Sequence, residues 1–180
     1  MKKIDLWMTG IALTGILNLQ AQSGCQVDLG TGNAGTLYER ITNPEEVRSL
    51  TVTGEIDARD FARVRDNMPD LLSFDLKGTD IVAYTGTEGT HYYDPGDPES
   101  GRPAEEITDI TYEAGTIPEY ALGYISEIVF PTSLTGLHTY AFSNSSTLTR
   151  LDFSLCNRLT EITYSLFWYQ GNLKEVRLPA

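Results

Sequence analysis

Few side chains in this 180-residue chain are of the types that carry out catalysis or hold a metal. The two histidines, His91 and His138, and the two cysteines, Cys25 and Cys156, are well separated in sequence. Zinc sites draw on closely spaced pairs of such residues, and a histidine-based triad needs a nucleophile and an acid beside its histidine. The sequence shows neither arrangement, so we expect no catalytic residues, no metal ion and no cofactor, and a protein that is not an enzyme.

One segment combines aromatic rings with carboxylates. Residues 85–103 are rich in Gly, Pro, Asp and Ser, which is typical of a long loop, and long loops are often functional. His91, Tyr92 and Tyr93 could stack on a ligand or cover an edge of the fold, and the sequence leaves both alternatives open. The nearby acids favour a solvated insertion over a calcium site, because their spacing matches no EF-hand. These acids are Asp94, Asp97, Glu99, Glu105 and Glu106.

A glycine-rich motif lies nearer the N-terminus. Residues 30–35 (GTGNAG) have the spacing of the dinucleotide-binding fingerprint. That fingerprint follows a strand and opens a helix, whereas we predict neither element beside these residues. The sequence therefore favours a flexible linker, which we expect over residues 22–36.

The elements that position these residues follow from an internal repeat. An apolar pattern L-x-x-L-x-L, in which L is any large apolar residue, recurs at intervals of 24, 36, 18, 23 and 25 residues. Three intervals fall within the length of leucine-rich repeats, about 20 to 29 residues. The insertion at 85–103 accounts for the longest interval, and we interpret the shortest as a reduced unit. The copies are Val47/Leu50/Val52, Leu71/Phe74/Leu76, Ile107/Ile110/Tyr112, Ile125/Ile128/Phe130, Leu148/Leu151/Phe153 and Leu173/Val176/Leu178.

Each copy predicts a short strand that is buried on one face. In Leu151-Asp152-Phe153 the outer residues point to one side of the strand and Asp152 points to the other. One unit cannot bury its apolar face alone, whereas stacked units create a continuous core and a parallel sheet. We therefore predict a strand-rich α/β fold over residues 37–180. It would be a right-handed leucine-rich-repeat solenoid with a parallel sheet of short strands and few short helices.

One helix is legible within this scheme. Asp57 can cap a segment in which Ala58, Phe61, Val64 and Met68 recur at helical spacing. A weaker helix start is predicted where Asn precedes Pro, at residues 43–46.

Large aromatic residues lie close to the C-terminus. Phe142 and Phe167 are 25 residues apart, which predicts that both occupy equivalent places in the core. Trp168 and Tyr169 follow directly, and they either anchor a ligand or shield the neighbouring repeat.

Several of these segments resemble a known family. Residues 130–135 (FPTSLT), 140–142 (YAF) and 148–149 (LT) resemble the repeat unit of BspA-like leucine-rich-repeat proteins. Residues 50–61 (LTVTGEIDARDF) look like the N-terminal unit of Bacteroidetes members, so the resemblance covers about residues 34–180. It implies an exported or surface-attached protein whose activity is adhesion or protein binding.

The chain departs from the family pattern at two matched positions. The family unit often has Cys three residues after its Ala-Phe phenylalanine, whereas this chain has Ser145 and Gln170 there. The last copy, at residues 173–178, is followed by no polar capping unit. Two alternatives are open: the chain is a shortened member of the family, or a partner covers that end, for example by self-association.

The alternate residues of the predicted strands would line the open face of the sheet. Four repeats present Ser, Thr and acidic residues there, and the last two add arginines, which gives a mixed-sign surface suited to protein contacts. A sugar site would normally need exposed aromatic rings on this face. The charged residues predicted for binding are Asp75, Asp109, Glu127, Arg150, Asp152, Glu175 and Arg177.

The first residues have the three parts of a secretory signal peptide, which we place at residues 1–21. Lys2 and Lys3 precede an apolar stretch at residues 6–19, which is shorter than the roughly 20 residues that a membrane span requires. Cys25 is either a lipid-modified first residue or part of a loose N-terminal tail. Both alternatives place the protein outside the cytoplasm, in the extracellular space or on the cell surface.

The charge balance narrows the range of partners. The chain has 13 basic and 25 acidic residues and a formal net charge of -12, which disfavours nucleic acid and anionic membranes. We therefore expect an exported, non-enzymatic module that binds a host or bacterial surface protein. The alternative is a glycan-binding or glycan-processing accessory protein that uses His91, Tyr92 and Tyr93 of the insertion together with Trp168 and Tyr169.

Overall fold

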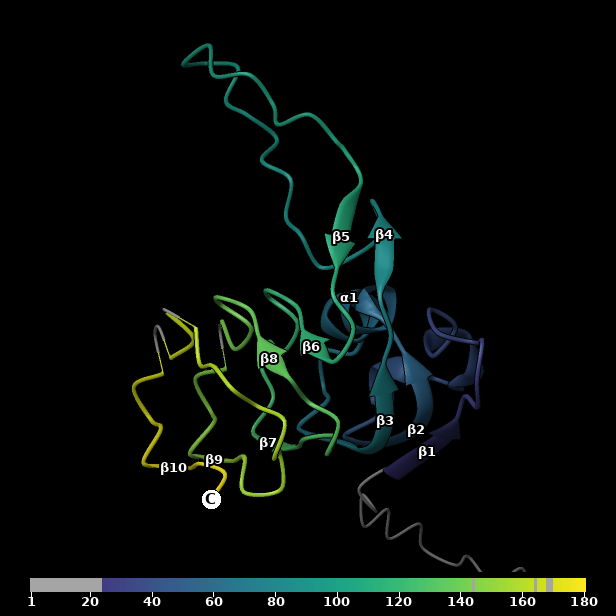
Figure 1. Ribbon diagram of the computed structural model, residues 1–180. Helices are drawn as coiled ribbons and strands as arrows, with labels where there is room; N and C mark the ends of the chain where they lie inside the picture. Colours follow the sequence, from purple (N-terminus) through teal and green to yellow (C-terminus); the bar gives the residue numbers. More distant parts are fainter. Residues whose placement is uncertain (1–23, 144, 164, 168–169) are drawn as a thin grey trace, which may run out of the picture.

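The computed structural model describes residues 24–143, 145–163, 165–167 and 170–180. The predicted signal peptide at residues 1–21 lies outside the described residues, as do Trp168 and Tyr169. The described chain has a mixed α/β fold with mostly short strands and few helices (Figure 1).

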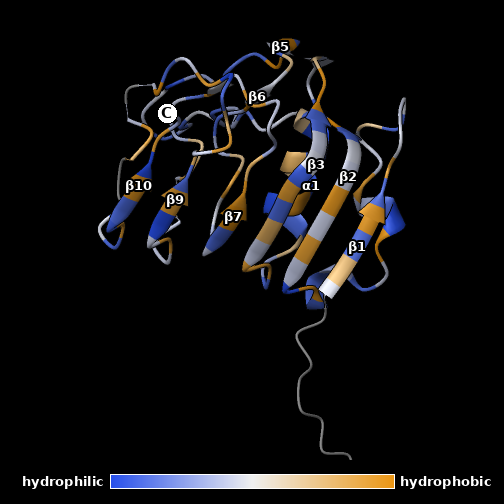
Figure 2. Ribbon diagram, turned by 60° about the horizontal axis from the view of Figure 1, so that its bottom comes forward, coloured by the Kyte–Doolittle hydropathy of each residue, from blue (hydrophilic) through white to orange (hydrophobic). Residues whose placement is uncertain are grey.

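The largest sheet of the described chain is a four-stranded parallel sheet. Its strands lie in the order β1-β2-β3-β7, and a separate parallel pair, β9 and β10, continues the row beyond β7 (Figure 2). The bounds are β1 (Gly24–Asp28), β2 (Ser49–Ile56), β3 (Ser73–Ile81), β7 (Glu127–Val129), β9 (Arg150–Asp152) and β10 (Glu175–Arg177). The smaller elements are η1 (Tyr38–Arg40), η2 (Pro44–Glu46), β4 (Tyr84–Gly86), β5 (Ile110–Tyr112), β6 (Thr116–Ile117) and β8 (Gly136–Leu137).

The predicted helix is confirmed as α1 (Ala58–Asn67). Asp57 caps it in a reciprocal capping box with Asp60. The Asp57 side chain accepts the Asp60 backbone N–H, and the Asp60 side chain accepts the Asp57 backbone N–H. Phe61 is fully buried and meets Phe74 of β3 edge to face, with ring centroids 6.4 Å apart. Of the weaker start, only the short η2 turn forms, and the Asn43 side chain makes no cap.

The spacing of the parallel strands follows the repeat, with one large exception. Ser49 of β2 pairs with Ser73 of β3, one repeat interval further on, but Ser73 pairs with Glu127 of β7, which lies more than twice as far along the chain. After Ile81 the chain leaves the sheet, and it returns where Gly115 N–H donates to the Ile81 carbonyl at 2.8 Å. Residues 82–114 are therefore a single excursion, which projects from the body (Figure 1).

The predicted insertion at 85–103 is part of this longer excursion. The predicted repeat copy at Ile107, Ile110 and Tyr112 is wrong. These residues do not join the parallel sheet, because β5 pairs antiparallel with β4 and the Tyr84 and Tyr112 rings stack at 6.1 Å. Ile107 is 67% exposed. The same apolar alternation is compatible with a hairpin strand and with a strand of the parallel sheet. Without the copy at residues 107–112, the intervals of 36 and 18 residues merge into a single interval between β3 and β7.

The predicted flexible linker at residues 22–36 is also wrong over its described part. Strand β1 pairs with β2 along its whole length, from Gly24 to Asp28. The Leu29 side chain is only 2% exposed, and the buried Asp60 carboxylate accepts the Gly35 N–H at 2.7 Å. This segment is held by backbone pairing with β2 and by the Asp60 carboxylate. Neither contact can be predicted from the glycine-rich composition of the segment.

The core is a continuous layer of apolar side chains that the inward positions of successive strands supply. Leu50, Phe74 and Leu151 are each at most 1% exposed, and Phe130 stacks on Phe153 at 4.5 Å. This confirms the inward register predicted for those strands. The expected core residue Phe167 is instead 38% exposed, because the preceding residue, Leu166, takes the buried position.

Polar side chains tie each turn of the chain to the turn before it. Ser145 and Gln170, which occupy the cysteine positions of the resembled family, are buried and donate to the carbonyls of Leu122 and Phe142. Cys156 is also buried, as expected, and its thiol lies 3.7 Å from the Pro131 carbonyl. These bonds satisfy buried backbone carbonyls where the strands are too short to do so.

Within the described residues, no helix has the length and hydropathy needed to cross a bilayer.

Candidate binding face

The outward positions of the parallel strands form one exposed surface, called here the open face. The ladders pair Asp75 with Val129 and Asp152 with Arg177, so the outward residues of neighbouring strands lie side by side. All of the predicted binding residues except Asp109 are on this face. They are Asp75, Glu127, Arg150, Asp152, Glu175 and Arg177.

The predicted position of Asp109 on the open face is wrong. It precedes β5 in the excursion and is exposed there, far along the chain from the parallel sheet. The error follows from the repeat copy at residues 107–112, which forms the hairpin with β4 instead of a sheet strand.

A network of four ion pairs covers β9 and β10. Arg150 contacts Asp152 at 2.6 Å and Glu175 at 3.7 Å. Arg177 contacts Glu175 at 2.6 Å and Asp152 at 3.9 Å, so each arginine lies between the same two acids. Hydrogen bonds from Ser154 and then from Arg150 lower the pKa of Asp152 to about 2. Asp152 is therefore ionised throughout the physiological pH range, and the network is open to solvent.

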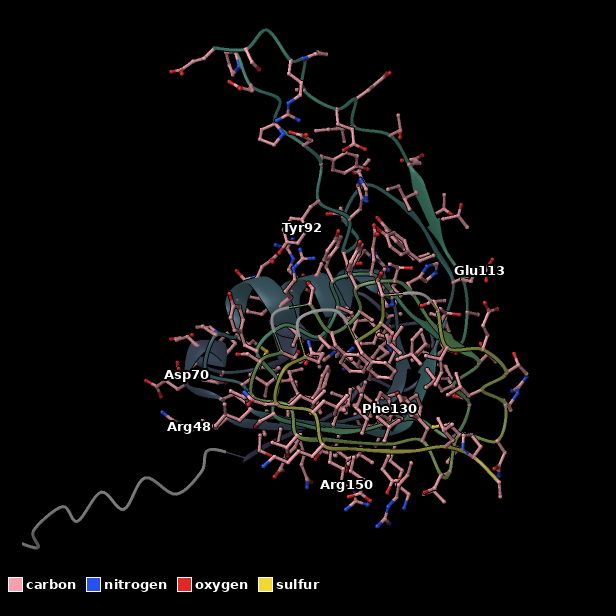
Figure 3. The ribbon with its side chains drawn as sticks, turned by 90° about the vertical axis from the view of Figure 1, so that its left-hand side faces the viewer. Arg48, Asp70, Tyr92, Glu113, Phe130 and Arg150 are labelled. Carbon is pink, nitrogen blue, oxygen red and sulfur yellow. The ribbon has the colours of Figure 1, made fainter. Side chains whose placement is uncertain are left out.

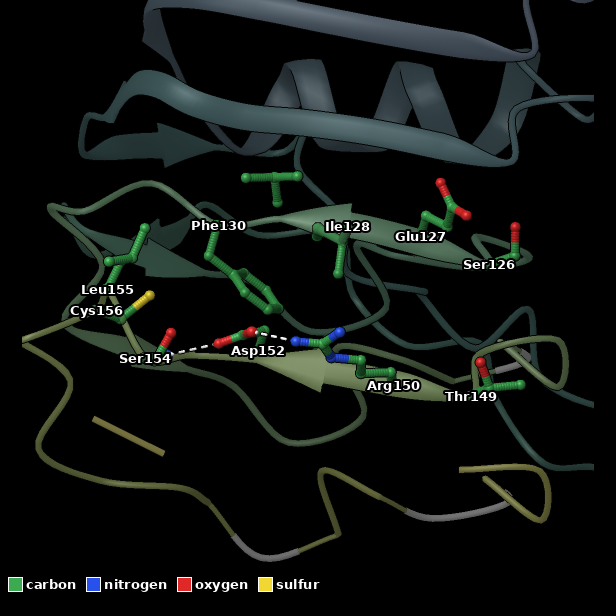
Figure 4. Close-up of a pocket in the computed structure, with 11 residues that line it drawn as sticks. Ser126, Glu127, Ile128, Phe130, Thr149, Arg150, Asp152, Ser154, Leu155 and Cys156 are labelled. Carbon is green, nitrogen blue, oxygen red and sulfur yellow. Dashed lines mark hydrogen bonds and ion pairs between the residues drawn. The ribbon is translucent and has the colours of Figure 1, made fainter. Parts of the chain in front are cut away.

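A groove of about 470 Å³ lies between β7 and β9 (Figure 4). Its inner wall includes the apolar side chains of Ile128, Phe130 and Cys156. Two exposed apolar residues also line it, Val129 at 43% and Leu155 at 58%. Leu155 could not be predicted from the repeat because it lies in the turn after β9, outside the repeated apolar pattern.

The aromatic residues of the excursion contact the protein itself. His91 lies between two carboxylates, with Nδ1 2.6 Å from Glu119 and Nε2 3.1 Å from Glu105. The hydrogen bond to Glu119, then that to Glu105, raises the pKa of His91 despite partial burial. The Tyr93 hydroxyl donates to the Thr108 carbonyl. The two acids are bridged by the imidazole ring, so they do not face each other across an open cleft.

Tyr92 is the most exposed ring of the excursion, at 57%, and it too has partners. The Arg65 guanidinium of α1 lies over its ring, 4.3 Å from the centroid. Its ring also meets Tyr120 edge to face at 5.2 Å, and Tyr120 stacks on Tyr140. These contacts favour the alternative in which the aromatic residues cover an edge of the fold.

Two acids of the excursion are used in local hydrogen bonds. Asp94 pairs with Arg102 and accepts the Gly96 N–H, while Asp97 accepts the N–H groups of Glu99 and Ser100. Within the described ranges, no group of three or more His, Cys, Asp or Glu residues is arranged to hold a metal ion.

The glycine-rich motif has its backbone donors already occupied by carboxylates. A nucleotide site would present such N–H groups to a phosphate at a helix N-terminus, whereas here only the three-residue η1 follows. The pairs are Gly30 N–H to Asp28 at 3.0 Å, Gly32 N–H to Glu55 at 2.7 Å and Gly35 N–H to Asp60 at 2.7 Å. Gly54 must be small because a Cβ there would lie 2.4 Å from the Gly30 nitrogen.

Comparison with protein-family models and with curated proteins gave no match.

Proposed function

We propose that this chain is an exported leucine-rich-repeat solenoid that binds another protein through its open face, at the bacterial surface, and that it is not an enzyme. The row of parallel strands supports the repeat interpretation, because three of the ladders join residues 24 or 25 positions apart. Such stacked units characteristically offer an extended surface for partners.

The observation that carries the proposal is the solvent-exposed ion network of Arg150, Asp152, Glu175 and Arg177. Its side chains are between 34% and 55% exposed. Pairs this exposed contribute little to stability, so the fold does not require them. Charges of both signs on a partner-binding rim fix the orientation of the partner and reject wrong ones. Figure 3 shows Arg150 on the opposite side of the body from Tyr92.

Protein binding is better supported than glycan binding. A sugar is usually held against the open face of an aromatic ring, whereas the rings of His91, Tyr92 and Tyr93 are engaged by Glu119, Arg65 and Thr108. The excursion aromatics therefore support a structural role. Trp168 and Tyr169, the other residues of the glycan alternative, lie outside the described residues.

A binding screen against matrix proteins and a glycan array tests the proposal. Arg150→Glu combined with Arg177→Glu should weaken protein binding at least tenfold and leave the circular-dichroism melt nearly unchanged, since both side chains are exposed. Arg40→Glu with Arg63→Glu is the matched control, because it makes the same charge change on exposed residues of η1 and α1. Glycan binding that both double variants leave intact, without protein binding, would contradict the proposal.

A further inference from the structure

The row of parallel strands is interrupted between β7 and β9. These strands lie side by side, yet no ladder joins them among the described residues, and β9 pairs only with β10. Side chains connect the two turns instead. The Thr147 hydroxyl lies 3.5 Å from the Ile125 carbonyl at one end, and the Cys156 thiol lies 3.7 Å from the Pro131 carbonyl at the other. The groove of about 470 Å³ opens at this interruption.

The groove offers a continuous apolar surface on an otherwise polar face. Val129 on the β7 side and Leu155 on the β9 side are both exposed, and the inner wall between them includes Ile128 and Phe130 (Figure 4). Isolated exposed apolar residues are ordinary, but residues that flank a groove with an apolar wall form a place where a partner side chain can be buried.

The charges beside the groove are not balanced. Glu127 on its rim forms no ion pair with any described residue, and the neighbouring Asp75 accepts only the Lys77 backbone N–H, at 2.9 Å. The Arg150 guanidinium on the opposite rim is already held by Asp152 and Glu175. The carboxylates left without a counter-charge next to the groove therefore favour a cationic group on the partner.

We propose that the groove between β7 and β9 receives a segment of a partner protein in which an apolar side chain lies next to lysine or arginine. The apolar side chain contacts Val129, Leu155 and the inner wall, and the cationic group contacts Glu127 and Asp75. The inference rests on the proposed function of the open face, and it adds the place and the chemistry of the principal contact.

Titration of the full-length, ¹⁵N-labelled protein with short synthetic peptides tests this inference by NMR. The three probes carry leucine between two lysines, leucine between two glutamates, and serine between two lysines. Only the lysine-flanked leucine peptide should shift the amide signals of residues 127–129 and 154–156 in a saturable way. Equal shifts with the serine peptide, or no saturable shifts with any probe, would overturn the proposal.

Matched variants locate the binding. Leu155→Asp and Glu127→Lys should each weaken the peptide at least tenfold. Ile107→Asp and Glu113→Lys make the same changes at exposed positions of the excursion and should leave the affinity unchanged. If the affinity falls equally in all four variants, the groove is not the site. Circular-dichroism melts of each variant, with Leu155→Ser as a milder change at that position, separate loss of binding from loss of fold.

The same variants distinguish this inference from the proposed function. A protein partner that is lost with the Arg150→Glu/Arg177→Glu variant but bound normally by Leu155→Asp and Glu127→Lys would overturn the groove and leave the open face as the binding surface. Peptide binding that depends on Leu155 and Glu127, without a protein partner that responds to the arginine variant, would support the groove and contradict the ion network as the recognition surface.

Discussion

Replacing the buried carboxylate of Asp60 by an amide should destabilise the protein strongly. Asp60 is 2% exposed, and its two oxygens accept three backbone N–H groups, from Gly35 at 2.7 Å, Leu37 at 2.9 Å and Asp57 at 3.0 Å. Asn keeps one acceptor oxygen and puts an NH₂ donor where the other oxygen was. Gly35 and Asp57 donate to the same carboxylate oxygen, so the favoured orientation keeps the Asn oxygen there and turns the NH₂ toward the Leu37 N–H, where two donors face each other.

The magnitude follows from the donors that lose their acceptor. A buried polar group without a partner costs about 1 to 3 kcal/mol, so the unpaired Leu37 N–H and the Asn NH₂ that faces it together cost about 2 to 6 kcal/mol. Burial disfavours the ionised carboxylate of Asp60 and therefore raises its pKa. The neutral Asn side chain avoids this cost. We therefore expect Asp60→Asn to lower the free energy of unfolding by about 2 to 4 kcal/mol.

Urea denaturation followed by circular dichroism measures this change, and amide hydrogen exchange shows where it acts. Exchange at Leu37 should accelerate more than exchange at Gly35 or in β3, because the Leu37 amide loses its acceptor directly. Asp66→Asn is the matched control on the same helix, where the exposed Asp66 pairs with Arg65 at 2.6 Å and should matter by less than about 1 kcal/mol. A stability of Asp60→Asn within about 0.5 kcal/mol of wild type, with protection at Leu37 unchanged, would refute the reasoning.

Three further predictions concern the core, the bonds between turns and the excursion. Leu151→Ala removes a fully buried residue of β9 and should cost about 2 to 5 kcal/mol in urea denaturation; an unchanged midpoint would contradict the assigned register. Ser145→Ala leaves the buried Leu122 carbonyl without its side-chain donor and should cost about 1 to 3 kcal/mol, whereas Ser145→Thr should recover part of the loss if the hydroxyl is what matters. The folded-state pKa of His91 is raised above 6.5, so its ion pairs with Glu105 and Glu119 contribute fully below the unfolded pKa and are lost as pH rises through the folded value. Limited proteolysis within residues 82–114 should accelerate over that pH window in wild type but not in His91→Gln, and equal pH dependence in both would contradict the assignment.

The local sequence pattern was sufficient to predict those elements that are stabilised by residues close together in the sequence. Asp57 and the apolar spacing of Ala58, Phe61 and Val64 predicted α1 because capping and helix amphipathicity are short-range properties. The inward positions of β2, β3 and β9 followed from alternation for the same reason, since the side-chain period of a strand is local.

The charged residues of the open face were predicted from the repeat, except at the copy that forms the hairpin of the excursion. Arg150, Asp152, Glu175 and Arg177 were placed correctly because their strands follow one another at the regular spacing of the repeat. Asp109 was placed on the face wrongly because it lies before a strand that has the same apolar pattern but pairs with β4. The apolar alternation within one strand does not specify which other strand it pairs with.

The sequence by itself determined the net charge, which is a property of composition. It also determined strands β2, β3, β7, β9 and β10 with their outward charges and the helix α1, which depend on residues a few positions apart. Tertiary structure alone decided that residues 82–114 leave the sheet, that residues 24–37 dock on β2 and Asp60, and that a groove opens between β7 and β9. Each of these outcomes depends on hydrogen bonds between residues far apart in the sequence, or on their absence. Such bonds form only after the chain has closed a loop, and no local preference specifies which distant donor meets which acceptor.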